Sequence, residues 1–447
     1  MFTDCAALVR DGGFACPSCG RRHTVSLRRL TLGREALSAL PEELRALGVR
    51  RPYLIADRNT WRAAGERAAA LLAASGFSPA RCLLPGGRPS PDEAAAGCAV
   101  MHLPPDADGV VGIGGGVVGD MAKLTAAVHG VPYLYVPTAP SMDGMASATS
   151  SVDRDGLKIS LPTRAPSSVV ADTGVLAAAP RELILAGYGD MAAKYVSLVE
   201  WELAHRITGE FYCPEIARAV REALRRAEAS VEAALAGDGG AAGALTEGLI
   251  LAGLAMECAG LSRPASGMEH YVSHIRSMRA LAFGTRSDLH GLECGAAALE
   301  VIRVYERLRD TKPDRARALA HAAAFDYEAH AAFLRRFVGP GAETMISLEA
   351  REGKYSPERH AARLDVILAH WEELAAVMRK LPSADALEAR FARIGFPTLS
   401  SLGVTEEERA GLFAASPDIR DKYVLGRLLW DLGEEPFPQN GAKTCIR

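Results

Sequence analysis

Hydrophobic residues in the first third of the chain form short continuous runs separated by helical patterns. The runs at 51–57 (RPYLIAD), 108–113 (DGVVGI) and 131–136 (VPYLYV) are largely apolar, and a polar residue, glycine or proline ends or follows each of them. Such runs are typical of strands in a buried parallel sheet. Residues 61–75 and 118–129 have the composition and periodicity of helices. Strand, helix and strand at these spacings predict a βαβ unit.

The pattern changes at about residue 180. From there almost to the C-terminus, long stretches rich in Ala, Leu, Glu and Arg have helical periodicity, and strand-like runs are nearly absent. We therefore expect an α/β N-terminal domain over 1–175 with a parallel sheet, and an all-helical domain over 176–447. Glycine-rich or proline-containing segments interrupt the helices at 237–240, 263–267 and 339–341.

Composition and charge narrow the class of protein. With 447 residues, 49% hydrophobic and 23% charged, the chain is neither disordered nor fibrous and has enough apolar material for a sizeable core. A net charge of −3 gives no sign of a nucleic-acid or membrane partner. Nine scattered cysteines, an N-terminus with early charges and an apolar run at 248–261 interrupted by Glu257 predict a reduced, soluble, cytoplasmic protein.

The clearest local motif is the glycine turn GIGGGVVGD at 112–120, which follows a predicted strand and opens a predicted helix. Backbone N–H groups at 114–116 can there approach a phosphate at the positive end of the helix. The acidic residue expected about 20 residues later, which would bind a ribose, is missing, but Asp57 at the end of another strand can take its place. A dinucleotide site is favoured over a turn that only packs a helix closely.

A segment of small and hydroxyl-bearing residues follows at 136–152 (VPTAPSMDGMASATSSV). Asp143, together with the glycine, alanines and serines around it, suits a loop that packs closely on a flat ligand. A polar surface loop has the same composition, so the sequence leaves both interpretations open.

Histidines gather in one part of the second half. His270 and His274 are four residues apart and therefore share one face of a helix, while His290 lies at the predicted start of the next helix. Asp190, in AGYGD, is expected near a helix start. Two imidazoles and a carboxylate form a ligand set suited to Zn²⁺, Ni²⁺ or Fe²⁺, with coordination positions left open for substrate oxygens. Histidines satisfied within an apolar core are the alternative.

The N-terminal CPSCGRRH resembles half of a zinc site, with Cys16, Cys19 and His23 as ligands. A structural site needs four ligands, and the sequence suggests only the distant Cys5 as the fourth. A turn that precedes the first strand is therefore the favoured interpretation of this segment.

Taken together, these motifs resemble those of the sn-glycerol-1-phosphate dehydrogenases, nearest their bacterial branch. The family lies within the superfamily of dehydroquinate synthases, glycerol dehydrogenases and iron-containing alcohol dehydrogenases. The resemblance extends over nearly the whole chain, and VPTAPSMDG and GYGDM are more specific to the family than the glycine turn. The matching segments are GIGGGVVGDMAKLTA, VPTAPSMDGMAS, AGYGDMAAKYVSLVEWELAH, EHYVSH with LHG, the N-terminal CxxCGxxH and the late IRDKYVLGRLLWDLG.

The resemblance implies a fold and an activity. The fold is an NAD(P)-binding α/β domain followed by a helical metal- and substrate-binding domain, as in dehydroquinate synthase and the iron-containing alcohol dehydrogenases. The activity is reversible reduction of dihydroxyacetone phosphate to sn-glycerol-1-phosphate, a compound used in phospholipid metabolism, with NADH or NADPH and one divalent metal, zinc or nickel. A small-molecule substrate, a homo-oligomer of two or more chains and no nucleic acid or membrane partner are also implied.

The resemblance also assigns roles to residues. The metal ligands are Asp190, His270 and His290, and the catalytic and substrate-contacting residues are Asp143, Asp190 and His274. Independently of the resemblance, Lys194 lies one helical turn after Asp190 and either meets the substrate phosphate or forms an i,i+4 ion pair with Asp190. The positions around the dinucleotide are Asp57, Gly114, Gly115, Gly116, Val117, Val118, Gly119, Thr138, Ser141 and Ser147.

One position departs from the family pattern, because Val117 stands where a serine or threonine is usual, and GGGVVGD is common in dehydroquinate synthases. Those lyases have a different segment after VPT and a glutamate as first metal ligand, so VPTAPSMDG and Asp190 argue against that chemistry. An NAD-dependent dehydrogenase of another small polyol or polyol phosphate, a sugar-phosphate cyclase and a non-catalytic binding role are the alternatives. Asp57 favours NAD over NADP, since a carboxylate repels a 2′-phosphate.

Overall fold

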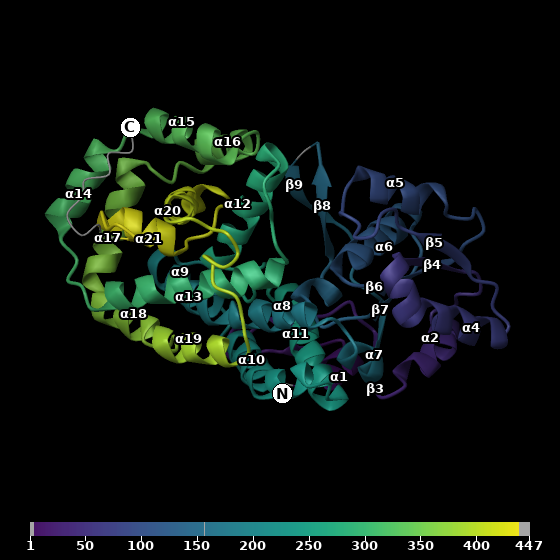
Figure 1. The fold of residues 1–447 in the computed structure, drawn as a ribbon. Helices are drawn as coiled ribbons and strands as arrows, with labels where there is room; N and C mark the ends of the chain where they lie inside the picture. The colour runs from purple at the N-terminus through teal and green to yellow at the C-terminus, as the bar shows by residue number, and fades with distance from the viewer. Residues whose placement is uncertain (1–3, 156, 438–447) are drawn as a thin grey trace. The chain divides into compact units, whose positions relative to one another are not determined.

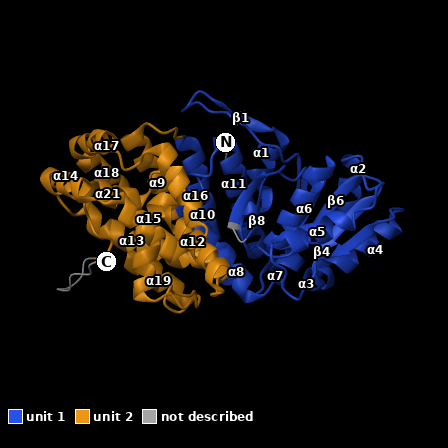
Figure 2. Cartoon of the chain, turned by 90° about the horizontal axis from the view of Figure 1, so that it is seen from above, with its two compact units in different colours: residues 1–194, 213–265, 289–292 blue, residues 195–212, 266–288, 293–447 orange. Residues whose placement is uncertain are grey.

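The computed structural model describes residues 4–155 and 157–437, which form two compact units (Figure 2). Unit 1 contains the N-terminal 194 residues together with residues 213–265 and 289–292. Unit 2 contains residues 195–212, residues 266–288 and the chain from residue 293 onward. The expected boundary near residue 175, between a dinucleotide-binding domain and a metal- and substrate-binding domain, remains a prediction.

Unit 1 is built around a six-stranded sheet in the order β3-β10-β7-β6-β4-β5, and every pair of neighbours is parallel. Two short antiparallel hairpins, β1-β2 and β8-β9, lie outside this sheet. The strands are β1 (Gly13–Ala15), β2 (Arg22–Thr24), β3 (Arg29–Gly33), β4 (Pro52–Ala56), β5 (Ala80–Leu83), β6 (Gly109–Gly114), β7 (Tyr133–Pro137), β8 (Thr149–Arg154), β9 (Leu157–Pro162) and β10 (Ser168–Asp172).

The strand order defines where a ligand can bind at this sheet. Strand β4 has β5 on one side and β6 on the other, so the chain reverses its direction of progress across the sheet at the β4–β6 pair. Ligands of open α/β sheets bind outside the carboxyl ends of the strands at such a switch point. The register pairs Ile55 with Gly112, which brings Asp57 and the glycine turn to the same edge.

Helices cover both faces of the sheet. On one face, η1 (Ala36–Ala39), α2 (Leu40–Ala46) and α4 (Glu66–Ala74) bury leucine and alanine side chains against residues such as Leu54 and Val111. On the other face lie α5 (Glu93–Met101) and α6 (Gly116–His129). Two sheet tyrosines bond to them there, since Tyr53 donates a hydrogen bond to the Ala99 carbonyl at 2.9 Å and Tyr133 donates one to the Gly119 carbonyl at 3.3 Å.

The predicted βαβ unit is confirmed as β6, α6 and β7, with β6 and β7 paired in parallel. Helix α6 ends before Gly130, whose φ of 70° is the left-handed conformation that glycine adopts most readily. The predicted loop at 136–152 is wrong at its end, because β8 begins at Thr149 and pairs with β9.

The remaining helices of unit 1 include a long, strongly apolar one, α11. It is long and apolar enough to cross a membrane by length and composition, yet 67% of its most apolar window is buried within the protein, as in the core helix of a globular fold. Its neighbour α10 packs along it. The other helical segments of unit 1, with these two, are α1 (Cys5–Arg10), α3 (Arg58–Thr60), the π-helical η2 (Trp61–Gly65), η3 (Asp143–Ala146), α7 (Thr173–Ala177), α8 (Arg181–Ala192), α10 (Pro214–Leu235) and α11 (Gly239–Ala259).

Unit 2 is helical throughout its described residues, as the sequence predicts (Figure 1). The three predicted interruptions, at 237–240 within unit 1 and at 263–267 and 339–341, all separate helices. Helix α13 begins with residues of unit 1 and continues into unit 2. The helices are α9 (Lys194–Thr208), α12 (Met268–Phe283), α13 (His290–Arg309), α14 (Arg315–Ala324), α15 (Tyr327–Val338), α16 (Ala342–Glu352), α17 (Pro357–Ala369), α18 (Trp371–Met378), α19 (Ala384–Arg393), α20 (Glu406–Ala415), η4 (Ser416–Asp418) and α21 (Leu425–Leu432).

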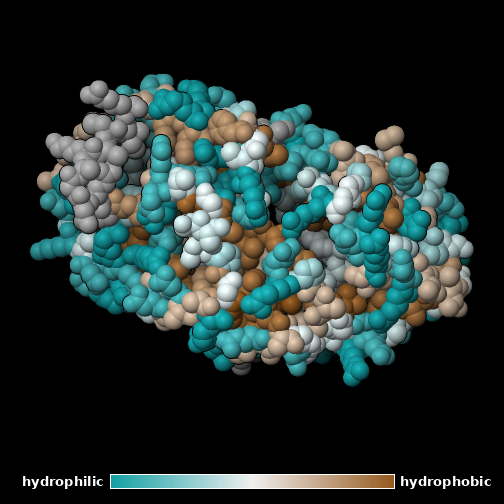
Figure 3. All heavy atoms as spheres, in the orientation of Figure 1, coloured by the Kyte–Doolittle hydropathy of each residue, from teal (hydrophilic) through white to brown (hydrophobic). Residues whose placement is uncertain are grey.

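Polar and charged side chains make up much of the molecular face in Figure 3. Within the described ranges, the large hydrophobic side chains that are strongly exposed are Met101, Val128, Leu281 and Phe283. Scattered exposed hydrophobic residues are usual on protein surfaces and do not by themselves mark a binding face.

Candidate functional site

The glycine turn joins β6 directly to α6, and its glycines serve two different purposes. A Cβ on Gly114 would lie 2.6 Å from the Val118 side chain, and one on Gly119 would lie 3.2 Å from the Tyr135 ring. These two glycines therefore allow close packing of helix on strand. At Gly115, by contrast, a Cβ would meet nothing within 4 Å, although its φ of −83° suits any residue. The backbone at Gly115 therefore has open space beside it at the start of α6.

The side chains that follow the turn differ in what they can offer a cofactor. Val118 is 1% exposed and packs against Gly114, so only its backbone N–H can point toward a ligand at the helix start. Val117 is half-buried. Gly116 is packed closely, since a Cβ there would lie 3.1 Å from the Met142 side chain.

Asp57 follows β4 at the same edge of the sheet and caps the helix α3. Its Oδ1 accepts hydrogen bonds from the backbone N–H groups of Asn59 (2.7 Å) and Thr60 (2.9 Å), and the Thr60 hydroxyl completes a capping box. The cap alone explains an aspartate here, so the predicted contact of Asp57 with a ribose stays a prediction.

The segment after β7 is held in place by a buried lysine that the sequence did not single out. Lys123 of α6 is 2% exposed and donates hydrogen bonds to the carbonyls of Gly144 (3.1 Å) and Thr149 (2.8 Å) and to the Ser147 hydroxyl (3.2 Å). Thr138 is joined to the glycine turn, since its N–H donates to the Gly114 carbonyl at 3.2 Å. Ser141 in the same segment is half-buried.

A glycine brings α8 against this segment. A Cβ on Gly187 would lie 1.7 Å from the carbonyl oxygen of Pro140, a distance that no side chain can tolerate. The close approach also places Asp190, one turn further along α8, beside the segment, where its Oδ2 accepts a hydrogen bond from the Asp143 N–H at 2.8 Å. Asp190 lies near the end of α8, so its predicted place near a helix start is wrong.

Asp190 and Asp143 share one ammonium group. The Lys194 Nζ lies 2.5 Å from Asp143 Oδ2 and 3.0 Å from Asp190 Oδ1, and both Lys194 and Asp190 are fully buried. Burial lowers the pKa of Lys194, but the two carboxylates raise it by more, so the net shift is upward. The predicted i,i+4 pair of Lys194 with Asp190 is confirmed, and the group carries a net charge of −1 when all three are ionised.

His290 begins α13 next to a glycine that contacts α8. A Cβ on Gly291 would lie 1.9 Å from the carbonyl oxygen of Ala186, one helical turn before Asp190. Gly187 and Gly291 are therefore packing residues, and through them unit 1 brings Asp143, Asp190 and the start of α13 into one region.

His270 and His274 lie on one face of α12 in unit 2, as predicted, with ring centroids 6.4 Å apart. His270 is 4% exposed, and its Nδ1 lies 2.8 Å from Oε1 of the fully buried Glu269. A carboxylate at Nδ1 fixes the proton on that nitrogen and leaves the lone pair of Nε2 for a metal. Glu269 was not predicted from the sequence, although an acidic residue directly before a candidate metal-binding histidine could have indicated it.

Asp190 and His290 belong to unit 1 and His270 to unit 2. Their binding of one metal ion therefore stays a prediction, which the chemistry of each ligand supports: a buried carboxylate, a helix-initial imidazole and an imidazole oriented by a carboxylate. The roles predicted for Asp143 and His274 in catalysis, and those predicted for the cofactor-contacting residues, also remain predictions.

Known proteins resemble this chain in sequence. Residues 31–180 match the family described as iron-containing alcohol dehydrogenase. A glycerol-1-phosphate dehydrogenase of Halalkalibacterium halodurans, named for use of NAD(P)+, is 35% identical over 292 residues, which are 64% of this chain and 73% of that protein. The protein of the same name from Methanothrix thermoacetophila is 36% identical over 276 residues, 61% of this chain and 75% of its own.

The structure resembles a glycerol dehydrogenase from Schizosaccharomyces pombe with a TM-score of 0.58, over 91% of this chain and 88% of the other, at 17% sequence identity. A mutant form of an archaeal alcohol dehydrogenase from a Red Sea brine pool gives a TM-score of 0.58 at 15% identity and covers 93% of this chain and 95% of the other. These similarities confirm the predicted fold, that of the iron-containing alcohol dehydrogenases.

Proposed function

This chain belongs to the glycerol-1-phosphate dehydrogenase family, and we propose that it catalyses the reversible NAD(P)H-linked reduction of dihydroxyacetone phosphate to sn-glycerol-1-phosphate. The observation that carries the proposal is the pairing of two features in unit 1. A glycine turn with an open approach lies at the switch point of the sheet, and the buried Asp143–Lys194–Asp190 group is joined to the segment that follows the neighbouring strand.

The dinucleotide is proposed to bind at the carboxyl edge of β4 and β6. The first N–H groups of a helix lack intrahelical acceptors and carry partial positive charge, so the start of α6 favours a pyrophosphate there. The open space beside Gly115 allows its oxygens to come close. Asp57 at the end of β4 favours NAD, because a carboxylate accepts hydrogen bonds from ribose hydroxyls and repels a 2′-phosphate.

Asp190, His270 and His290 would hold one divalent cation, proposed to be zinc or nickel. Oxygen and imidazole nitrogen donors suit either ion, and the Glu269 carboxylate at Nδ1 of His270 is the partner that metal-bound histidines generally have. When bound, the cation supplies a Lewis acid for the C2 carbonyl oxygen of the substrate.

We assign a different role in the reduction of the substrate carbonyl to each of the nearby protein side chains. Asp143 accepts a hydrogen bond from the substrate hydroxyl, while Lys194 fixes both carboxylates and offsets one of their two charges. His274, one turn from His270, delivers the proton that the reduced oxygen needs, because an imidazole exchanges protons readily near neutral pH. When bound, the nicotinamide would supply the hydride from its C4.

We further propose that the enzyme acts in the cytoplasm as a homo-oligomer, and that its product enters phospholipid metabolism. The many scattered cysteines support a reducing compartment, since none of the cysteines within the described residues forms a disulfide.

The test is NADH oxidation with dihydroxyacetone phosphate, using enzyme stripped by a chelator and then reloaded with zinc or nickel. We expect activity to disappear on stripping and to return with one of the two metals. A reloaded enzyme that binds metal but oxidises no NADH with this or another small carbonyl phosphate would refute the dehydrogenase function and favour a cyclase.

Gly115→Ala provides a specific test of the cofactor site. A Cβ at this position meets no protein atom and the backbone angles suit alanine, so we expect a loss of stability of no more than about 1 kcal/mol, the usual cost of alanine at a helix N-cap. The methyl group would, however, occupy the space through which a pyrophosphate approaches the backbone. We expect KM for NADH to rise about tenfold, equivalent to ~1.4 kcal/mol, with a small change in kcat. An unchanged KM in steady-state kinetics would place the pyrophosphate elsewhere.

A further inference from the structure

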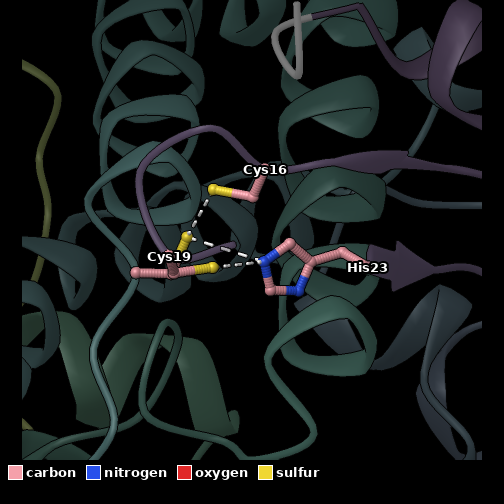
Figure 4. Close-up of side chains that lie close together, drawn as sticks. Cys16, Cys19 and His23 are labelled. Atoms are coloured by element: carbon pink, nitrogen blue, oxygen red, sulfur yellow. Dashed lines mark hydrogen bonds between the residues drawn. The ribbon is translucent and has the colours of Figure 1, made fainter. Parts of the chain in front are cut away.

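A second cluster of metal-binding side chains lies in unit 1, at the N-terminal hairpin. Cys16, Cys19, His23 and Cys213 each offer one ligand atom, and the four atoms all lie within 4.8 Å of one another. Cys16 and Cys19 belong to the turn between β1 and β2, and His23 lies on β2 (Figure 4). Cys213 comes from the start of α10, so the expectation that only Cys5 offers a fourth ligand is wrong.

The distances within the cluster resemble those of an occupied tetrahedral site. Cys16 Sγ and Cys213 Sγ are 3.6 Å apart, and Nε2 of His23 lies 3.2 Å from Cys19 Sγ and 3.7 Å from Cys213 Sγ. Tetrahedral zinc with bonds of about 2.3 Å to sulfur and about 2.0 Å to nitrogen would separate sulfurs by about 3.8 Å and sulfur from nitrogen by about 3.6 Å. Little movement is needed to accept the ion.

The histidine is oriented as a ligand. Its Nδ1 lies 2.6 Å from the backbone carbonyl oxygen of Cys258, which can only accept a hydrogen bond, so the proton is on Nδ1. Nε2 therefore carries a lone pair and points at the three sulfurs. A backbone carbonyl is one of the partners that usually hold metal-bound histidines in this tautomer.

The turn itself positions the two neighbouring cysteines. Gly20 has a φ of 70°, and its N–H donates to the Cys16 carbonyl at 3.0 Å, which closes a tight turn over CPSCG. The turn therefore holds the Cys16 and Cys19 side chains together, with their sulfurs within 4.8 Å of each other.

Burial and ligand number define the kind of site. Cys16, His23 and Cys213 are each less than 5% exposed, and Cys19 is half-buried. Four protein ligands leave no coordination position for a substrate, which is typical of structural zinc sites. From this geometry we infer that Cys16, Cys19, His23 and Cys213 bind a structural Zn²⁺ ion that fastens the β1-β2 hairpin to the start of α10. The inference does not depend on the proposed dehydrogenase activity.

A second cysteine group offers a matched control. Cys82, Cys98 and His102 also lie within 4.8 Å of one another, but they are three ligands, and His102 is exposed with Nδ1 2.9 Å from the Cys98 carbonyl oxygen of its own helix. A set of three with an exposed member lacks the closed shell of four, so we expect it to hold no structural ion.

The test measures zinc per chain in the full-length protein, purified with a reductant and dialysed against a mild chelator. The variants are His270→Ala, which removes a ligand of the proposed dehydrogenase metal, and two double variants that add Cys213→Ser or Cys98→Ser to it. We expect one retained zinc per chain in His270→Ala and in the double variant with Cys98→Ser, and loss of this zinc in the double variant with Cys213→Ser. Equal zinc in the double variant with Cys213→Ser and in His270→Ala would overturn the inference.

A second measurement does not depend on whether Cys213→Ser folds. X-ray absorption at the zinc edge of His270→Ala is expected to show three sulfur ligands and one nitrogen ligand. A shell of oxygen and nitrogen alone would contradict the site. So would metal-free protein in which mass spectrometry finds a Cys16–Cys213 disulfide, since that pair would then be a redox couple.

Discussion

Replacing His270 with alanine is expected to lower kcat/KM for dihydroxyacetone phosphate by about 10³-fold or more. Lewis-acid stabilisation of the developing alkoxide supplies several kcal/mol, and each ~1.4 kcal/mol that is lost costs a factor of ten. Removing one of three protein ligands also weakens metal binding. The measurement combines steady-state kinetics, at saturating zinc or nickel, with metal analysis of the dialysed variant.

Two further variants accompany this experiment: Glu269→Gln tests the hydrogen-bond partner of His270, and His129→Ala is the control. Glutamine keeps the shape of Glu269 but removes the charge that holds the proton on Nδ1 of His270, so we expect metal affinity to fall by about 10- to 100-fold. His129 is exposed at the end of α6, and its replacement should leave kinetics and metal content unchanged. An effect of Glu269→Gln as small as that of His129→Ala would show that the charge of Glu269 does not support metal binding by His270.

Gly187→Ala is expected to destabilise the protein by about 3 kcal/mol or more and to reduce activity strongly. The new Cβ would lie 1.7 Å from the Pro140 carbonyl oxygen, and a backbone atom cannot rotate away as the end of a side chain can. Helix α8 must then move from the segment that carries Asp143, which breaks the 2.8 Å hydrogen bond between the Asp143 N–H and Asp190. The urea midpoint of unfolding and kcat measure the two effects.

Gly97→Ala is the matched control for this prediction. Gly97 lies within α5, and a Cβ there would meet nothing within 4 Å. Alanine is the better helix former, so this variant should be more stable by about 0.5–1 kcal/mol and fully active. If Gly187→Ala behaved like Gly97→Ala, the close packing of α8 on the Pro140 segment would not exist in solution.

The elements predicted well from the sequence are those whose pattern is local and continuous. Strand β6 and helix α6 are joined by a glycine turn and ended by Gly130, and β7 follows as a buried run that ends at Pro137. Each of these features is encoded within a few neighbouring residues. The βαβ unit, and with it the position of the turn at the carboxyl edge, could therefore be found without a structure.

One pair of strands missed from the sequence depends on partners far apart along the chain, and another pair does not. Strand β10 has five buried residues but pairs with β3, more than 130 positions earlier, and β3 itself is only half-buried. The β8-β9 hairpin had a local signal, an alternating run around Asp155 and the glycine that follows it, which the interpretation of the segment as a loop overlooked.

In the candidate sites, too, contacts between residues close in the sequence were predicted and contacts between distant segments were not. Spacing placed His270 and His274 on one face of a helix, and the pairing of Lys194 with Asp190 follows from four residues of separation. The partnership of Asp143 with Asp190 and the approach of Cys213 to the CPSCG turn depend on how distant segments pack, because 47 residues separate the first pair and 190 or more separate Cys213 from its neighbours. No local pattern encodes such contacts.

The configuration of the product tests the proposed function most directly. Metal-reloaded enzyme is incubated with dihydroxyacetone phosphate and NADH, and the glycerol phosphate formed is analysed with an enzyme specific for one enantiomer. We predict sn-glycerol-1-phosphate in an amount equal to the NADH oxidised. Formation of sn-glycerol-3-phosphate, or no NADH consumption with fully reloaded enzyme, would contradict the proposed function.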